Sequence, residues 1–213
     1  MADIVLTGDT SGAITVAAPA VAGTNTLTLP ATTGTLLDTN SSLSASNLTG
    51  DIPIASFPTG SILQVVSVQP DTGLISSTTT AFFEVDSDLR VAITPKASDS
   101  TLIVTCNFLF GGNNQSGMCA FKLYDITNSL NVNTSALGSR QECNSSLRDM
   151  SYDQNDATQI QLQAQRTSGS TVARTYGMYA KLESGTRYFF ANPSDTGALG
   201  YAKPSITVME VAA

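Results

Sequence analysis

The sequence GSILQVVSVQPDTGLISSTTTAFFEVDSDLR occupies residues 60–90 and separates two parts of the chain that differ in composition. It contains the first long apolar segment, residues 61–69, and the first adjacent aromatic pair, Phe82 and Phe83. Residues 61–69 are apolar at odd and even positions alike, which predicts a strand buried on both faces. We interpret this stretch as the junction between an N-terminal arm and a folded C-terminal head.

The head is expected to consist of short alternating strands. Segments with strand character follow at residues 79–85, 89–94, 102–110, 118–126, 157–166, 172–183, 186–190 and 205–211. The first two of these predict a hairpin-like pair around residues 86–88. Thr and Gln at outward positions indicate one solvated face for each sheet. Only residues 136–150 leave room for a helical turn, so residues 60–213 predict an all-β, antiparallel, jelly-roll-like sandwich.

The N-terminal part is expected to be an extended, β-rich arm. Residues 1–60 contain four Asp and no Lys, Arg or Glu. Four very short strands are predicted at residues 4–6, 13–16, 24–29 and 35–37, separated by Gly, Pro and Asp. None can bury a face alone, so residues 1–37 are expected to be ordered by partner chains, whereas the abundant Ser, Thr and Gly leave a flexible linker as the alternative. Residues 38–59 are expected to be an extended connector, because Pro53 and Pro58 prevent a helix.

Several segments resemble proteins of bacteriophage particles. SGAITVAAPAVAGTNTLTLPATTGTLL at residues 11–37 and SLSASNLTGDIP at residues 42–53 are similar to segments of tail-fibre and other virion proteins, especially from phages of marine and freshwater bacteria and cyanobacteria. GSILQVVSV at 60–68, VAITPKASDSTLIV at 91–104 and SITVMEVA at 205–212 resemble the accompanying β-sandwich head. The resemblance therefore covers nearly the whole chain.

The resemblance implies a homotrimeric virion projection that is assembled in the host cytoplasm. It implies that residues 1–59 attach to other virion proteins of the capsid or the tail. It does not decide whether the projection is a capsid decoration, a head fibre or a short tail fibre. The apolar residues expected to anchor the arm are Ile4, Val5, Leu6, Leu27, Leu29, Leu36 and Leu37.

Charge and hydropathy argue against several classes of partner. The net charge is −7 and only 13% of residues are charged. Binding to nucleic acid or to an anionic membrane surface would require a basic face, so neither is expected. The first ten residues, MADIVLTGDT, lack the features of a signal peptide. No apolar run approaches the ~20 residues of a membrane helix, so no membrane insertion is expected.

No catalytic or metal-binding motif stands out. The chain has no His, which excludes Ser-His-Asp and Cys-His systems. It has no Gly-rich phosphate-binding motif and no CxxC pair, so we expect no enzyme activity, no cofactor and no metal. We expect the three cysteines to be structural thiols, and these are Cys106, Cys119 and Cys143. The carboxylate pairs Asp86/Asp88 and Asp153/Asp156 leave a glycan-degrading spike protein as an alternative to solvated turns.

Two polar segments are candidates for contact with a host glycan or receptor. They contribute Asn113, Asn114, Gln115, Tyr152, Asp153, Asn155 and Asp156. Amide and carboxylate groups can hydrogen-bond a sugar while the Tyr152 ring stacks on its apolar face. The alternative is a pair of solvated loops rich in turn-forming residues. The second segment lacks the spacing and the Gly of an EF-hand calcium loop.

Overall fold

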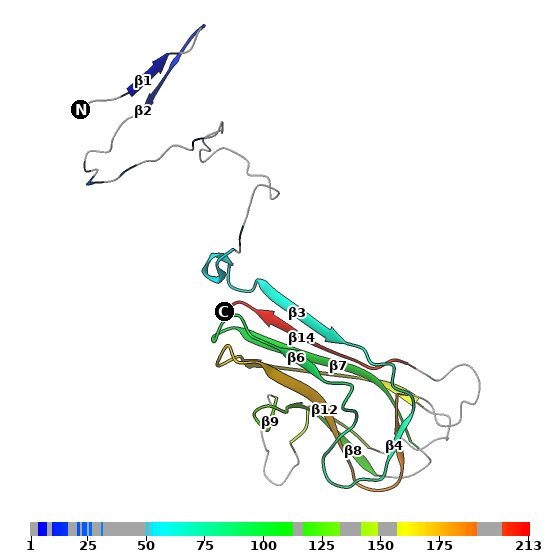
Figure 1. Ribbon diagram of the computed structural model, residues 1–213. Helices are drawn as coiled ribbons and strands as arrows, with labels where there is room; N and C mark the ends of the chain where they lie inside the picture. Colours follow the sequence, from blue (N-terminus) through cyan, green and yellow to red (C-terminus); the bar gives the residue numbers. More distant parts are fainter. Residues whose placement is uncertain are drawn as a thin grey trace. The chain divides into compact units, whose positions relative to one another are not determined.

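The computed structural model describes residues 4–7, 10–16, 21, 23–24, 26, 31, 50, 52–112, 117–132, 142–148, 157–190 and 202–213. The chain divides into two units, residues 1–50 and residues 51–213. Most strands of the two units are labelled in Figure 1.

The first unit contains a two-stranded antiparallel ribbon. Strand β1 (Ile4–Thr7) pairs with β2 (Ala13–Val16), and Thr7 lies opposite Ala13. This confirms the first two predicted strands, whereas those at 24–29 and 35–37 lie largely outside the described residues. Wherever the burial of a residue in this unit is described, that residue is exposed.

The segment that leads into the head contains one turn of 3-10 helix. This turn, η2 (Ile54–Ser56), follows Pro53 and closes with a hydrogen bond from the Phe57 N–H to the Ile54 carbonyl at 3.0 Å. Proline is compatible with the start of a helix because its missing N–H is not required there. The described end of the expected connector, residues 52–59, is therefore not uniformly extended.

The second unit is a sandwich of two antiparallel sheets (Figure 1). The first sheet consists of β3 (Ile62–Val68), β14 (Ser205–Val211), β7 (Thr101–Gly112) and β11 (Ala157–Thr167), extended by β13 (Arg187–Phe189) and β4 (Ile75–Ser77). The second consists of β5 (Phe83–Glu84), β6 (Val91–Ile93), β12 (Arg174–Leu182), β8 (Met118–Asp125), β9 (Leu130–Asn131) and β10 (Ser145–Arg148). β10 occupies part of the segment that left room for a helical turn.

The strand order is that of a jelly roll. β5 and β6 pair with the same edge of β12, and β9 and β10 pair with the same edge of β8, so each pair acts as one interrupted strand. Leaving out β4 and β13, the eight strands in chain order are β3, β5/β6, β7, β8, β9/β10, β11, β12 and β14. With these numbered 1 to 8, the first sheet has the order 1-8-3-6 and the second has the order 2-7-4-5. This order confirms the predicted all-β, jelly-roll-like class.

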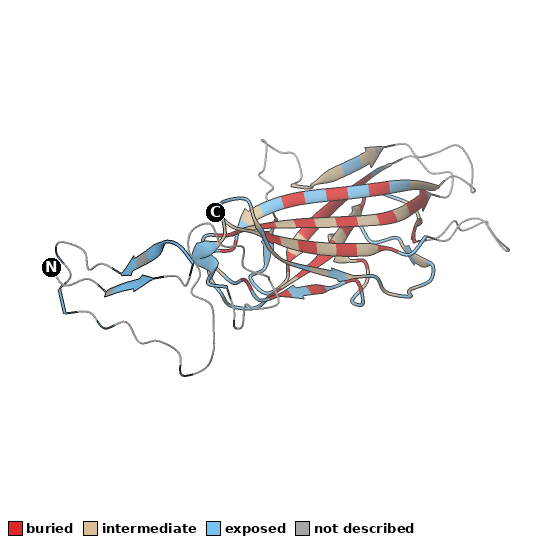
Figure 2. Cartoon of the chain, turned by 90° about the horizontal axis from the view of Figure 1, so that it is seen from above, coloured by how far each residue is buried: buried red, intermediate tan, exposed pale blue. Residues whose placement is uncertain are grey.

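The core lies between the two sheets and follows the two-residue period of the strands. In β7 the buried residues are Leu102, Val104, Cys106, Phe108 and Phe110. β12 contributes every second residue from Tyr176 to Leu182. Figure 2 shows this alternation as red bands separated by tan or pale blue bands along the long strands. Phe110 contacts Phe121 edge to face at 4.8 Å and Phe189 at 5.3 Å, which joins the two sheets.

The predicted hairpin around residues 86–88 is wrong. β5 and β6 do not pair with each other. Both pair with the same edge of β12, β5 near one end of that strand and β6 near the other. The Val85 N–H donates to the Met178 carbonyl at 3.1 Å. An ion pair between Glu84 and Arg90 bridges the two ends of the segment that joins β5 to β6. The expected hairpin is thus replaced by two short strands, β5 and β6, that each pair with β12.

The prediction that residues 61–69 form a strand buried on both faces is also wrong. β3 lies at the edge of the first sheet and pairs only with β14 among the described strands. Ile62 is 57% exposed and Val65 is 53% exposed, while Val66 and Val68 pack against the core. An apolar run alone does not distinguish an edge strand from a central one, because its neighbours come from distant parts of the chain.

Candidate functional site

The predicted glycan-contact residues lie outside the described residues, but the ends of their loops are neighbours. Asn113, Asn114 and Gln115 follow β7, and residues 152–156 precede β11. Gly111 near the end of β7 pairs with Ala157 at the start of β11, and Met118 pairs with Arg148. The jelly-roll order therefore brings the ends of both segments to one end of the sandwich.

The predicted anchoring residues belong to the first unit. Ile4, Val5 and Leu6 lie in β1, and Val5 and Leu6 are exposed by 56% and 59%. The remaining four lie outside the described residues, namely Leu27, Leu29, Leu36 and Leu37. Exposed Val5 and Leu6 are compatible with an anchoring role, because apolar side chains gain stability when a partner removes them from water.

The described residues contain a further candidate, a cluster of aromatic rings around one lysine. The alternation of β8 places Lys122 and Tyr124 on the outer face of the second sheet, and the register places Tyr179 of β12 opposite Lys122. Phe82 comes from the segment before β5. The Lys122 Nζ lies 4.1 Å from the ring centroid of Phe82, 4.7 Å from that of Tyr124 and 6.0 Å from that of Tyr179. We call these four residues the aromatic cluster.

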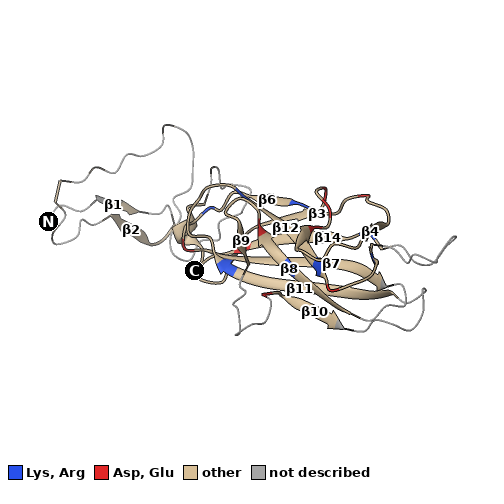
Figure 3. Cartoon of the chain, turned by 90° about the horizontal axis from the view of Figure 1, so that it is seen from below, with Lys and Arg blue, Asp and Glu red and all other residues tan. Residues whose placement is uncertain are grey.

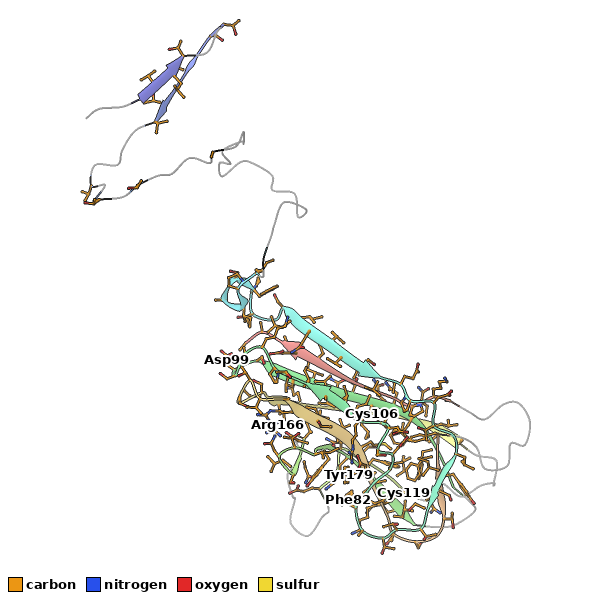
Figure 4. All side chains as sticks on the ribbon, viewed as in Figure 1. Phe82, Asp99, Cys106, Cys119, Arg166 and Tyr179 are labelled. Carbon is orange, nitrogen blue, oxygen red and sulfur yellow. The ribbon has the colours of Figure 1, made fainter. Side chains whose placement is uncertain are left out.

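The aromatic cluster combines partly exposed rings with a shielded charge. Phe82 and Tyr179 lie close together in Figure 4, and the rings of Tyr124 and Tyr179 are 4.7 Å apart. All three rings are partly exposed, whereas Lys122 is only 9% exposed. Burial lowers the pKa of Lys122, and the carboxylate of Glu142 partly opposes this change. The ring faces provide the favourable electrostatic contact that this desolvated ammonium needs.

An ion pair borders the aromatic cluster. Glu84 lies opposite Tyr179 in the sheet and accepts two hydrogen bonds of 2.6 Å from the guanidinium of Arg90. Burial raises the pKa of Tyr179, and the nearby Glu84 carboxylate raises it further. Aromatic faces next to fixed hydrogen-bonding groups are suited to sugars, which stack on rings through their C–H surfaces and bond through their hydroxyls.

Sequence reasoning missed the aromatic cluster. The two-residue period of residues 118–126 puts Tyr124 on the same side of its strand as Lys122, as the structure has it. Phe82 and Tyr179 are far from Tyr124 in the sequence, and only the pairing of β8 with β12 and β5 brings the three rings together. The available signal was the outward parity of both tyrosines, which by itself does not identify neighbouring strands.

A second buried polar cluster surrounds Asp125. The Asp125 carboxylate, fully buried at the end of β8, accepts hydrogen bonds from Arg166 at 3.0 Å and Arg174 at 3.4 Å, and from the backbone and side chain of Asn128. Charges in the interior require such partners because water no longer solvates them. The network closes the end of the second sheet.

Two of the three cysteines, Cys106 and Cys119, are buried. All three are free thiols. Burial raises the pKa of Cys106 well above its ordinary value and also raises that of Cys119. Among the described residues, no three Cys, Asp or Glu side chains are grouped so as to hold a metal ion. Within the same residues, no helix has the length and hydropathy needed to cross a membrane.

Comparisons with known proteins give only weak structural likenesses. No protein-family model matches the sequence, and no curated protein matches it. One match is to a chain in the structure of the infectious bursal disease virus Gt strain. The matched region covers 70% of this chain and 38% of the viral chain, with 10% sequence identity and a TM-score of 0.37. A second match, to a chain in the structure of the Gx strain, covers 72% of this chain and 38% of the viral chain, with 10% sequence identity and a TM-score of 0.35. The present chain therefore spans well under half of either viral chain, and likenesses at these scores support no inference about function.

Proposed function

We propose that this chain is a non-enzymatic structural protein of a virion. Three copies form a short projection, in which residues 1–59 attach to capsid or tail proteins. The jelly-roll head remains exposed, where it stabilises the particle or adsorbs to the host surface. The proposal is supported by the resemblance of residues 11–37, 42–53 and 205–212 to segments of phage virion proteins. Jelly rolls also occur in viral capsid proteins and lectins, although a fold alone does not define a function.

The single observation that carries the proposal is the contrast between the two units. The head has a closed core that joins both sheets. The ribbon of β1 and β2 has four residues in each strand, and its Val5, Leu6 and Val16 are all more than half exposed. An isolated two-stranded ribbon is at best marginally stable in water. The ribbon therefore requires a partner, as an anchoring segment does and a second globular domain does not.

Imaging of particles tests this proposal. A surface cysteine at Ser87 in the head is labelled with gold on the full chain, and the label is located on virions by electron microscopy. Regular labelling of the capsid would define a decoration protein or head fibre, and labelling confined to the tail would define a short tail fibre. A chain lacking residues 1–50 should leave the particle unlabelled. If virions never carry the label, or if the truncated chain still labels them, the proposal fails.

A second candidate function, glycan binding by the head, is favoured by the aromatic cluster. Tyr179→Ala and Tyr124→Ala should each weaken binding to an array of host surface oligosaccharides by roughly tenfold, because stacking on one ring contributes about 1 kcal/mol or more. Tyr188→Ala, which changes a partly exposed tyrosine on the other sheet, is the matched control. Equal binding by all variants would contradict this candidate. Release of shortened oligosaccharides, abolished by Asp153→Asn or Asp156→Asn, would instead support a glycan-degrading enzyme.

A further inference from the structure

The outer face of the first sheet carries no charged side chain along its four long strands. The outward positions are the odd-numbered residues within 65–67, 101–109, 159–167 and 205–211, and they are Val, Ser, Thr, Ile, Asn, Leu, Gln and Met. The charged residues of these strands, Glu210 and Arg166, lie at even positions, on the side of the core. We call this surface the uncharged face. It is accessible, because its residues are partly or largely exposed.

The rest of the head surface is different. The outer face of the second sheet carries Lys122, Lys181 and Glu84 on the strands themselves. In Figure 3, β7 and β11 are tan over long stretches, and the charged residues gather mainly in loops and at strand ends. A solvated sheet face normally mixes charges of both signs, whereas the centre of a protein interface is depleted of charge. The uncharged face therefore has the composition of an interface.

Apolar side chains concentrate in one row of the uncharged face. Val65, Met209 and Ile103 lie side by side across β3, β14 and β7, and Gln165 of β11 continues the row. Val65 is 53% exposed. Contact with a partner would remove this row from water at a favourable ~25 cal/mol per Å² of apolar surface.

The charge of the chain identifies the partner that this face fits. Each copy carries a net charge of −7, so two copies repel each other wherever their acidic surfaces meet. A face without charge allows two like-charged copies to approach without such a penalty. A binding face for a basic partner would carry acidic residues that complement its charge. The uncharged face carries no acidic residue, so it does not fit such a partner.

The position of the apolar row also favours a second copy. The chain enters the head at Gly60, whose N–H donates to the Ala212 carbonyl at 2.9 Å, immediately after β14. The row containing Met209 is therefore at the end of the sheet where the arm joins. If the arms associate in the proposed trimer, they hold the heads together at this end and raise their local concentration.

We propose that the uncharged face is the surface through which neighbouring copies of the head contact one another, with Val65, Met209 and Ile103 at the centre of the contact. This inference rests on the proposed trimer, and it names the surface that the trimer buries. The occupant is a second copy of this chain, packed around the threefold axis.

Methionine oxidation of the full chain tests the contact directly. Met209 lies on the uncharged face, and Met118 is a partly exposed reference on the second sheet. Hydrogen peroxide converts accessible methionine to the sulfoxide, which peptide mass spectrometry quantifies. Native mass spectrometry of the same sample should show three times the 22.1 kDa chain mass. Met209 should then be oxidised roughly tenfold more slowly than Met118.

A charge variant with a matched control identifies the surface. Gln161→Glu, Gln163→Glu and Gln165→Glu together add three carboxylates to the uncharged face with almost no change in shape, at exposed positions. They should remove the protection of Met209. The control variant, with Thr78→Glu, Thr80→Glu and Ser87→Glu, adds the same charge at exposed loop positions and should retain it.

The outcomes separate the inference from the proposed function. A trimeric mass with Met209 oxidised as fast as Met118 would overturn the contact surface and leave the trimer intact. A monomeric mass would overturn both. Protection of Met209 that appears only on virions and not in the purified chain would assign the face to another virion protein, which also overturns the inference. If the charge variant does not fold, dilution of the wild-type chain decides the question, because Met209 is less exposed than Met118 within one copy and only its oxidation rate relative to Met118 should rise as the trimer dissociates.

Discussion

At the scale of single residues, Glu210 shows how a charged group stabilises the head from inside the sandwich. Its carboxylate accepts hydrogen bonds from the N–H groups of Lys96 at 2.8 Å and Ala97 at 3.1 Å, and from the Ser100 hydroxyl at 2.7 Å. The Gln64 amide also donates to it. The polar turn at residues 95–100 is thus attached to the first sheet by one buried carboxylate.

These contacts give Glu210 a pH-dependent role. Burial alone would raise the pKa of this carboxyl, but the hydrogen bonds from Ser100, Gln64 and the backbone lower it below its usual value of 4.5. Because the folded pKa is lower than the unfolded pKa, Glu210 stabilises the fold fully above the unfolded value. This contribution is lost as the pH falls from about 4.5 through the folded pKa.

The variant Glu210→Gln should lower the free energy of unfolding at pH 7 by roughly 1–3 kcal/mol, because the charge-assisted hydrogen bonds become neutral or unmade. The difference from wild type should shrink as the pH falls below about 4.5, since protonation removes the same charge from the wild-type residue. Urea unfolding between pH 7 and pH 3 measures both effects. Asp88→Asn, at an exposed loop position, is the control and should change little. A difference from wild type that does not depend on pH would contradict this role.

At the scale of elements, β12 illustrates what periodicity can and cannot predict. The alternation of Tyr176, Met178, Ala180 and Leu182 toward the core was apparent from the sequence, and the structure confirms it. The partners of β12 were not apparent. β5 and β6 are only two and three residues long, so neither carries enough of the alternating pattern to indicate which strand it joins.

The glycine in the middle of β12 has a packing role. A Cβ atom on Gly177 would lie 2.9 Å from Cδ1 of Ile126 and 3.2 Å from Oε1 of Glu84. The Ile126 side chain and the Glu84 carboxylate therefore occupy the space above Gly177. The missing side chain allows the Glu84–Arg90 ion pair to lie against β12.

Gly177→Val should destabilise the head by about 1–3 kcal/mol, because the larger side chain displaces Ile126 and Glu84 from a filled position. Thr175→Val, on the same face of the same strand, is the control and should change stability by less, because a β-branched residue is already present there. Thermal unfolding followed by circular dichroism measures both variants. Equal stability of Gly177→Val and wild type would show that this face of the sheet is loosely packed.

At the scale of the whole molecule, the two units differ in how they can be stabilised. The head buries a core of large apolar side chains between two sheets, with Phe108, Phe110 and Phe121 in edge-to-face contact. Every core residue that the structure describes belongs to the second unit. The stability of the head should therefore not depend on the first unit.

Deletion of residues 1–50 should leave the urea midpoint of the head unchanged within error when both proteins are measured at a concentration low enough for both to be monomeric, because association would itself stabilise the folded head. It should also reduce association between copies, because the arm no longer tethers the heads. Equilibrium unfolding and native mass spectrometry measure the two effects. A large fall in the midpoint would indicate that the arm stabilises the head, and would contradict the division into independent units.

The sequence by itself determined the class of the fold. Alternation in residues 102–110, 157–166 and 205–211 indicates strands and the side that faces the core, because the two-residue period is a local property of extended chain. The absence of His excluded the catalytic systems that depend on it. The composition of residues 1–60 indicated that this part cannot form a core of its own.

Only the tertiary structure decided which strands are neighbours. In a jelly roll the neighbours of a strand come from distant parts of the chain, so the edge position of β3 and the shared edge of β5 and β6 have no local signal. The aromatic cluster and the uncharged face are products of the same pairing. Each is assembled from residues on several strands, and the register of those strands is set by packing between the sheets rather than by the sequence of any one of them.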